Sequence, residues 1–198
     1  GKPWARKPRG GQARWIFDGD RALLLTEAGT ERRAGVWVVA GDPDRSEPLS
    51  HLGPDATDVD AATMHGLLTA QNTRVHGSPR DQRRIAGLGR RLANETLHRA
   101  RMSPFAMTGS MTEADAAALV TAIVDAVDDG LAFERGRESM SSSKDRPGRV
   151  HHRTGETCPE CDQAIAEVAY NAYTVHYCPT CQTDGRVLAD NTTSKFLK

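Results

Sequence analysis

Four cysteines near the end of the chain are the residues whose type and spacing most clearly predict chemistry. They form two CxxC pairs separated by sixteen residues: Cys158, Cys161, Cys178 and Cys181. Each pair lets two thiolates reach one ion from a tight turn, and two such turns make a tetrahedral site of four sulfurs. The spacing predicts one structural Zn2+ ion, and a pair of disulfides is the alternative. His176 precedes Cys178 by two residues, and we expect it to face solvent or a partner because four cysteines suffice.

The segment between the cysteine pairs has the pattern of a β-hairpin. Residues 164–170 and 173–177 alternate β-branched and aromatic with smaller or polar side chains, and Asn171-Ala172 is a plausible turn between them. No recognition helix fits between the pairs. We therefore expect a hairpin with one cysteine knuckle at each end, which places strands rather than a helix against a partner.

The first fifty residues have the pattern of β structure. Short apolar runs at 13–17, 21–26 and 35–39 predict three strands, and Asp-Gly at 18–19 and residues 27–30 predict the turns between them. A meander of this kind cannot bury two faces by itself. We interpret it as the remaining half of a β-sandwich.

The middle of the chain has helical periodicity. Residues 61–70 predict a short helix, and residues 81–101 predict a helical block that a turn interrupts near Gly87-Leu88-Gly89. A further helix begins after Thr112, whose capping partner is Asp115, and Gly130 is its expected stop. The fold class is therefore α+β. We expect a sandwich remnant at 1–55, a helical domain at 56–150, a finger at 151–185 and a tail at 186–198.

Positive charge is concentrated although the chain as a whole is neutral, with 26 basic and 26 acidic residues. Eight arginines lie between residues 74 and 101, where only Asp81 and Glu95 oppose them. Residues 135–153 add further basic side chains. Basic residues concentrated in this way can bind a polyanion through local counterion release, or they can form a solvated charged face. No apolar run approaches the length of a membrane span, and we expect an intracellular protein in a compartment that keeps thiols reduced.

Three groups of motifs, in the right order, resemble one family. They are Asp81–Gly89 with Ala93–Ala100 and Ser103-Pro104, then Thr154–Cys161 with Tyr177–Gln182, and Leu52–Asp55. They resemble the helix-two-turn-helix segment, the zinc finger and the end of the N-terminal sandwich of formamidopyrimidine-DNA glycosylases and endonuclease VIII. The resemblance covers about residues 20–190.

The resemblance implies base excision repair as a DNA glycosylase and AP lyase. Such enzymes flip a damaged base from the duplex, and an N-terminal proline amine forms a Schiff base before β-elimination. It also implies double-stranded DNA with a damaged base or abasic site as the partner, a monomer, and the cytoplasm of a bacterium, associated with the nucleoid. Because this chain does not begin Pro-Glu, and Trp4 follows Pro3, we expect no catalytic residue in it and no activity from it alone.

Three predicted DNA contacts differ from the residues of that family. His76 stands in place of a phosphate-binding lysine, Arg90 in place of the asparagine after Gly-x-Gly, and Tyr173 in place of the hairpin arginine. The DNA contacts that we predict are His76, Arg90, Arg91 and Tyr173. A non-catalytic DNA-binding module on the same scaffold is the alternative function. A zinc-stabilised protein-interaction domain, in which the basic side is idle, is a third.

Overall fold

The computed structural model describes residues 10–19, 21–27, 33–77, 81–137, 145–170 and 173–188. The chain divides into two compact units, Gly1–Ser50 and His51–Lys198. The secondary structure combines helices with two separate two-stranded antiparallel sheets, so the predicted α+β class is confirmed. Within the described residues, no helix is both long and apolar enough to cross a membrane.

The N-terminal unit contains one β-hairpin. Strand β1 (Gly11–Phe17) pairs with β2 (Arg21–Thr26), and Gly19 in the turn has a φ of +73°, which glycine adopts readily. The predicted third strand at 35–39 is wrong, because these residues belong to no strand. A strand needs a hydrogen-bonded neighbour, and within the described part of this unit the only ladder joins β1 to β2. The predicted turn at 27–30 lies mostly outside the described residues.

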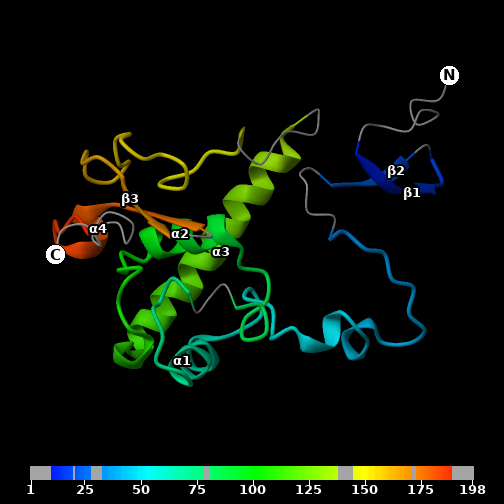
Figure 1. The fold of residues 1–198 in the computed structure, drawn as a ribbon, viewed down its shortest axis with the longest axis horizontal. Coiled ribbons are helices and arrows are strands. Elements are labelled where there is room, and N and C mark those ends of the chain that lie inside the picture. The colour runs from blue at the N-terminus through cyan, green and yellow to red at the C-terminus, as the bar shows by residue number, and fades with distance from the viewer. Residues whose placement is uncertain are drawn as a thin grey trace. The chain divides into compact units, whose positions relative to one another are not determined.

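Three helices of the second unit enclose its main core. They are α1 (Ala61–Thr69), α2 (Arg90–Arg99) and α3 (Glu113–Arg135), and α3 packs against both of the others (Figure 1). Met64, Leu97 and Ile123, one from each helix, are 0% exposed. This shared core sets the position of α2, and therefore of the polar side chains that α2 presents to the finger.

Local signals explain where these helices begin. Asp60 caps α1 by accepting the Thr63 N–H at 2.8 Å, and Thr112 and Asp115 form the predicted capping box of α3. The turn before α2 is centred on Gly87, whose φ is +92°. Gln82 holds that turn by accepting the Gly87 N–H and donating to the Leu88 carbonyl.

Two helix predictions were wrong in extent. Residues 81–86 form turns rather than helix, so α2 starts only at Arg90. The long helix continues past Gly130 to Arg135, where Gly136 is its C-cap.

The finger follows as a hairpin of β3 (Ala166–Tyr170) and β4 (Tyr173–Tyr177), which confirms the predicted strands. The short helix α4 (Pro179–Thr183) begins inside the second CxxC pair. Figure 1 shows the orange hairpin beside α2, and β4 contacts α2. A second small core, within the finger and at its entrance, contains Val150, Cys158, Ile165 and Cys178.

Candidate zinc centre and nucleic-acid interface

The two cysteine pairs meet in one cluster. The Sγ atoms of Cys158 and Cys181 are 4.0 Å apart, and those of Cys161 and Cys178 are 3.4 Å apart. A disulfide needs about 2.0 Å, and all four cysteines are free. Four sulfurs around a Zn2+ ion with bonds of about 2.3 Å lie roughly 3.8 Å from one another. The separations therefore fit a metal site and not the disulfide alternative.

Backbone turns bring the thiols together. The Cys158 N–H donates to the Gln163 carbonyl at 2.8 Å, and Cys158 accepts the Asp162 N–H on its own carbonyl at 3.2 Å. In the second knuckle, Cys178 is the N-cap of α4, and its Sγ accepts the Cys181 N–H at 3.5 Å. N–H donors directed at sulfur stabilise a thiolate, as metal coordination requires.

Burial also affects the protonation of the thiols. Burial raises the pKa of the Cys178 thiol to about 11, and it also raises the pKa of Cys181. A hydrogen bond from the Gln163 backbone lowers the pKa of Cys161. Buried thiols of high pKa remain protonated at neutral pH unless a cation binds them, and Zn2+ deprotonates a coordinating thiol. When bound, the ion supplies folding energy to the finger rather than chemistry on a substrate.

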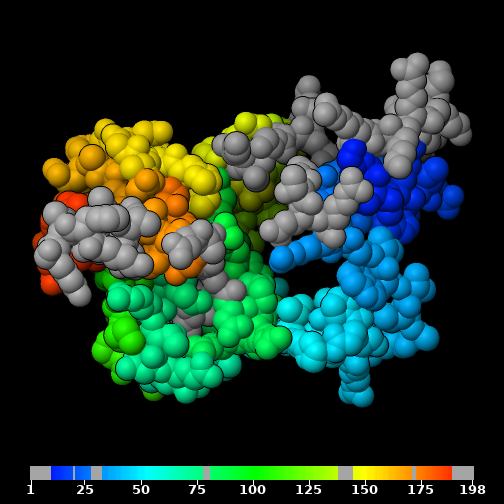
Figure 2. Space-filling view, viewed as in Figure 1, coloured from blue at the N-terminus to red at the C-terminus, as the bar shows by residue number. Residues whose placement is uncertain are grey.

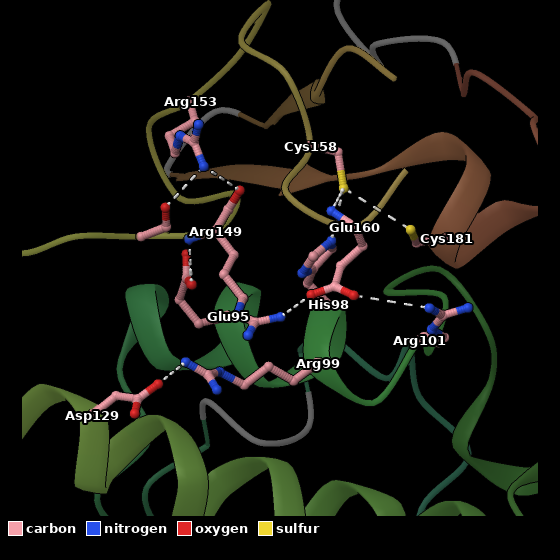
Figure 3. Close-up of polar contacts among 11 residues, drawn as sticks. Glu95, His98, Arg99, Arg101, Asp129, Arg149, Arg153, Cys158, Glu160 and Cys181 are labelled. Atoms are coloured by element: carbon pink, nitrogen blue, oxygen red, sulfur yellow. Dashed lines mark hydrogen bonds and ion pairs between the residues drawn. The ribbon is translucent and has the colours of Figure 1, made fainter. Parts of the chain in front are cut away.

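His98 is a further member of this cluster that the sequence did not indicate. Its Nε2 lies 3.3 Å from the Cys158 Sγ, and the ring is 1% exposed (Figure 3). Burial lowers the pKa of His98, so the ring is neutral and can donate its Nε2–H to a thiolate. Its ligand atom and those of Cys158, Cys178 and Cys181 all lie within 4.8 Å of one another. His98 therefore joins α2 to the cysteine cluster.

Glu95 forms a second connection between α2 and the finger. Its carboxylate accepts three consecutive backbone N–H groups, from Arg149 at 2.7 Å, Val150 at 3.1 Å and His151 at 2.9 Å. Glu95 is 6% exposed, and Figure 3 shows it on α2 below the loop that it holds. This loop leads into Cys158, so the carboxylate fixes the entrance to the finger.

A buried asparagine links the helical part to the hairpin. Asn94 is 1% exposed, and its Oδ1 lies 3.0 Å from the His76 Nε2. Its Nδ2 contacts the Nδ1 atoms of His151 at 2.8 Å and His176 at 3.2 Å. Burial lowers the pKa of His151 to about 3, so its ring is neutral and can accept this hydrogen bond. The expectation that His176 faces solvent is wrong, because the side chain is 4% exposed and packs beside Asn94.

The predicted DNA contacts occupy different environments. Arg90 is exposed at the first position of α2. Arg91 is half-buried, and its guanidinium donates to the Arg146 and Pro147 carbonyls. Tyr173 is half-buried at the start of β4, and the His76 ring stacks on it. The geometry thus brings His76 and Tyr173 together, leaves Arg90 accessible and engages Arg91 in holding a loop.

Comparison with known proteins connects this arrangement to one family. Residues 155–183 match a family described as a zinc finger found in FPG and IleRS. The chain is 40% identical over 149 residues to an uncharacterized formamidopyrimidine-DNA glycosylase-like protein of Mycobacterium tuberculosis, covering 74% of this chain and 94% of that protein. It is 34% identical over 196 residues to the formamidopyrimidine-DNA glycosylase of Sphingopyxis alaskensis, covering 87% of this chain and 72% of that enzyme. The chain belongs to the formamidopyrimidine-DNA glycosylase family.

The fold of this family member agrees with a solved relative. The crystal structure of the MutM (Fpg) protein from Thermus thermophilus superposes with a TM-score of 0.69 at 28% identity, covering 89% of this chain and 70% of that one. The resemblance drawn from the motifs is therefore confirmed, and so is a zinc finger at the predicted place. The chain spans 64% of the length of other formamidopyrimidine-DNA glycosylases that it matches.

Proposed function

We propose that this chain binds double-stranded DNA containing a damaged base or an abasic site, as part of base excision repair. The observation that carries the proposal is the exposed Arg90 at the start of α2, in a family whose named members are DNA glycosylases. A helix N-terminus attracts phosphate through its free N–H groups and its dipole, and an arginine at that end adds bidentate donors. Arg90 therefore contacts the DNA backbone in this proposal.

The zinc centre stabilises the part of the protein that carries Arg90. We propose that Cys158, Cys161, Cys178 and Cys181 hold the ion, and that His98 donates a hydrogen bond to Cys158. Because His98 and Glu95 both lie on α2, the finger and the helix that begins with Arg90 form one body. The ion then acts by keeping the hairpin beside α2.

Substitution of Arg90 tests the DNA contact. We expect Arg90→Ala to weaken duplex binding irrespective of sequence and to make the slope of log affinity against log salt shallower by about one. The measurement is fluorescence anisotropy of a labelled duplex at several salt concentrations. Stability should change little, because Arg90 is exposed.

Arg101→Ala is the matched control. This arginine lies beyond the opposite end of α2, and its side chain is 68% exposed. We expect its slope to equal that of the unchanged chain. An unaltered affinity and slope for Arg90→Ala would mean that the start of α2 does not contact DNA.

Borohydride trapping on a duplex that contains an abasic site distinguishes catalysis from DNA binding alone. The chemistry of the family needs an N-terminal proline amine with a neighbouring glutamate. We propose that residues 1–198 alone give no trapped complex, and that a version extended upstream to a Pro-Glu start does. Trapping by this chain alone would refute its inactivity. Trapping by neither, with salt-sensitive binding by both, would favour a non-catalytic DNA-binding module.

A further inference from the structure

Three aromatic rings form one stack at the finger. The rings of Tyr170 and Tyr173 are 4.8 Å apart at an interplanar angle of 22°, and those of Tyr173 and His76 are 5.6 Å apart at 14°. Tyr170 and Tyr173 are directly opposite each other at the end of the β3–β4 ladder. The rings of His76, Tyr173 and Tyr170 are hereafter called the aromatic column.

The aromatic column is held at its inner end and partly accessible at its outer end. His76 is 3% exposed, and its Nε2 is 3.0 Å from the Oδ1 of the buried Asn94. Tyr170 and Tyr173 are half-buried, so each retains some contact with solvent. A ring system fixed in this way loses little conformational freedom when a further planar group stacks on it.

Positive charge lies beside the aromatic column. Arg74 is exposed and lines the same small cavity as His76, Tyr170 and Tyr173. Arg90 is four residues before Asn94 on α2, which places both side chains on one face of the helix. The cavity has a volume of about 80 Å³, well below the roughly 300 Å³ at which small-molecule pockets begin. The cavity is therefore too small to enclose a planar ligand, and the exposed parts of the two tyrosine rings are the surface on which such a ligand could stack.

We propose that the aromatic column is a stacking site for an unpaired DNA base, whose backbone phosphates lie toward Arg74 and Arg90. This inference rests on the proposed function and adds a base contact to it. Aromatic side chains beside a cationic groove bind single-stranded nucleic acid with little sequence preference, because every base has a π face.

The test uses a single-stranded oligodeoxythymidine that contains one 2-aminopurine, whose fluorescence falls when the base stacks. The variants are Tyr170→Leu and Tyr173→Leu, with Tyr170→Phe and Tyr173→Phe as matched controls that keep the ring. We expect the unchanged chain and both Phe variants to quench the probe. Each Leu variant should lose quenching and bind the strand about 5- to 150-fold more weakly, the range for one stacked base.

Two further measurements distinguish loss of stacking from loss of folding and from loss of phosphate contacts. Zinc content and thermal melting establish that each Leu variant is folded. Affinity for a fully paired duplex should change less than affinity for the single strand, because the phosphate contacts remain. Folded Leu variants that quench and bind the single strand like the unchanged chain would overturn the stacking site. Failure of the unchanged chain to bind the duplex would instead refute the proposed function.

Discussion

Cys178→Ser is expected to remove zinc from the protein and to unfold the β3–β4 hairpin. Cys178 is 0% exposed and caps α4, so a serine here removes one sulfur ligand and leaves a hydroxyl in the buried site. Zinc binding in small fingers supplies about 10–16 kcal/mol of apparent folding energy, and the incomplete site cannot supply it. The measurements are zinc content per chain after dialysis against a chelator, and protease sensitivity of the finger.

Thr180→Ser is the matched control, because Thr180 is an exposed residue of the same CxxC turn. It should keep one zinc ion per chain and a protected finger. A Cys178→Ser variant with the same zinc content and the same protection would show that the cluster is not a structural zinc site.

Glu95→Ala is expected to destabilise the second unit by about 3 kcal/mol or more. The substitution leaves the N–H groups of Arg149, Val150 and His151 without their carboxylate acceptor, and an unsatisfied buried donor costs about 1–3 kcal/mol. The loop into Cys158 should loosen as a consequence. Urea unfolding gives the change in free energy, and amide hydrogen exchange at residues 149–151 reports the loop directly.

Glu156→Ala separates this effect from loss of a surface charge. Glu156 pairs with Arg153 at 2.8 Å, and its side chain is 57% exposed. Exposed pairs of this kind contribute about 0–1 kcal/mol. Equal changes in the free energy of unfolding for the two alanine variants would contradict the role of Glu95 as a connection between α2 and the finger.

The parts of the structure that could be predicted depend on short-range signals. The two CxxC pairs, the alternation on either side of Asn171-Ala172 and the capping pair at Thr112 and Asp115 all act within a few residues. Proline directly after Cys178 was also a usable signal for α4, since proline favours the first turn of a helix. Local sequence therefore predicted most elements of the finger and the start of α3.

The predictions of secondary structure were wrong where tertiary contacts determine whether an element forms and where it ends. A glycine at 130 weakens a helix by only about 1 kcal/mol. Beyond it, Glu134 pairs with Arg146 at 2.6 Å, and Asp129 before it pairs with Arg99 at 2.6 Å. The long helix therefore continues past the predicted stop. Residues 35–39 have strand propensity, but the described part of their unit offers no ladder for them.

The least predictable site residues are those that join distant segments. His98 and Cys158 are 60 residues apart, and Asn94 and His176 are 82 apart. The residues next to each of them in the sequence give no signal that predicts these contacts. Figure 2 shows the orange finger against the green helical part, and the two contacts join residues of these parts. Only the assembled fold assigns them.

The affinity of the unchanged chain for a duplex with one abasic-site analogue, measured from 50 to 200 mM salt, tests the central claim most directly. Contacts from Arg74 and Arg90 to two phosphates predict a slope of log affinity against log salt of about −2. Over this fourfold range, affinity should then fall by roughly 10- to 20-fold. A steep linear decline would support phosphate contacts by the basic side of the second unit. A salt-independent affinity, or no binding at 50 mM, would contradict the account and favour a zinc-stabilised protein-interaction domain.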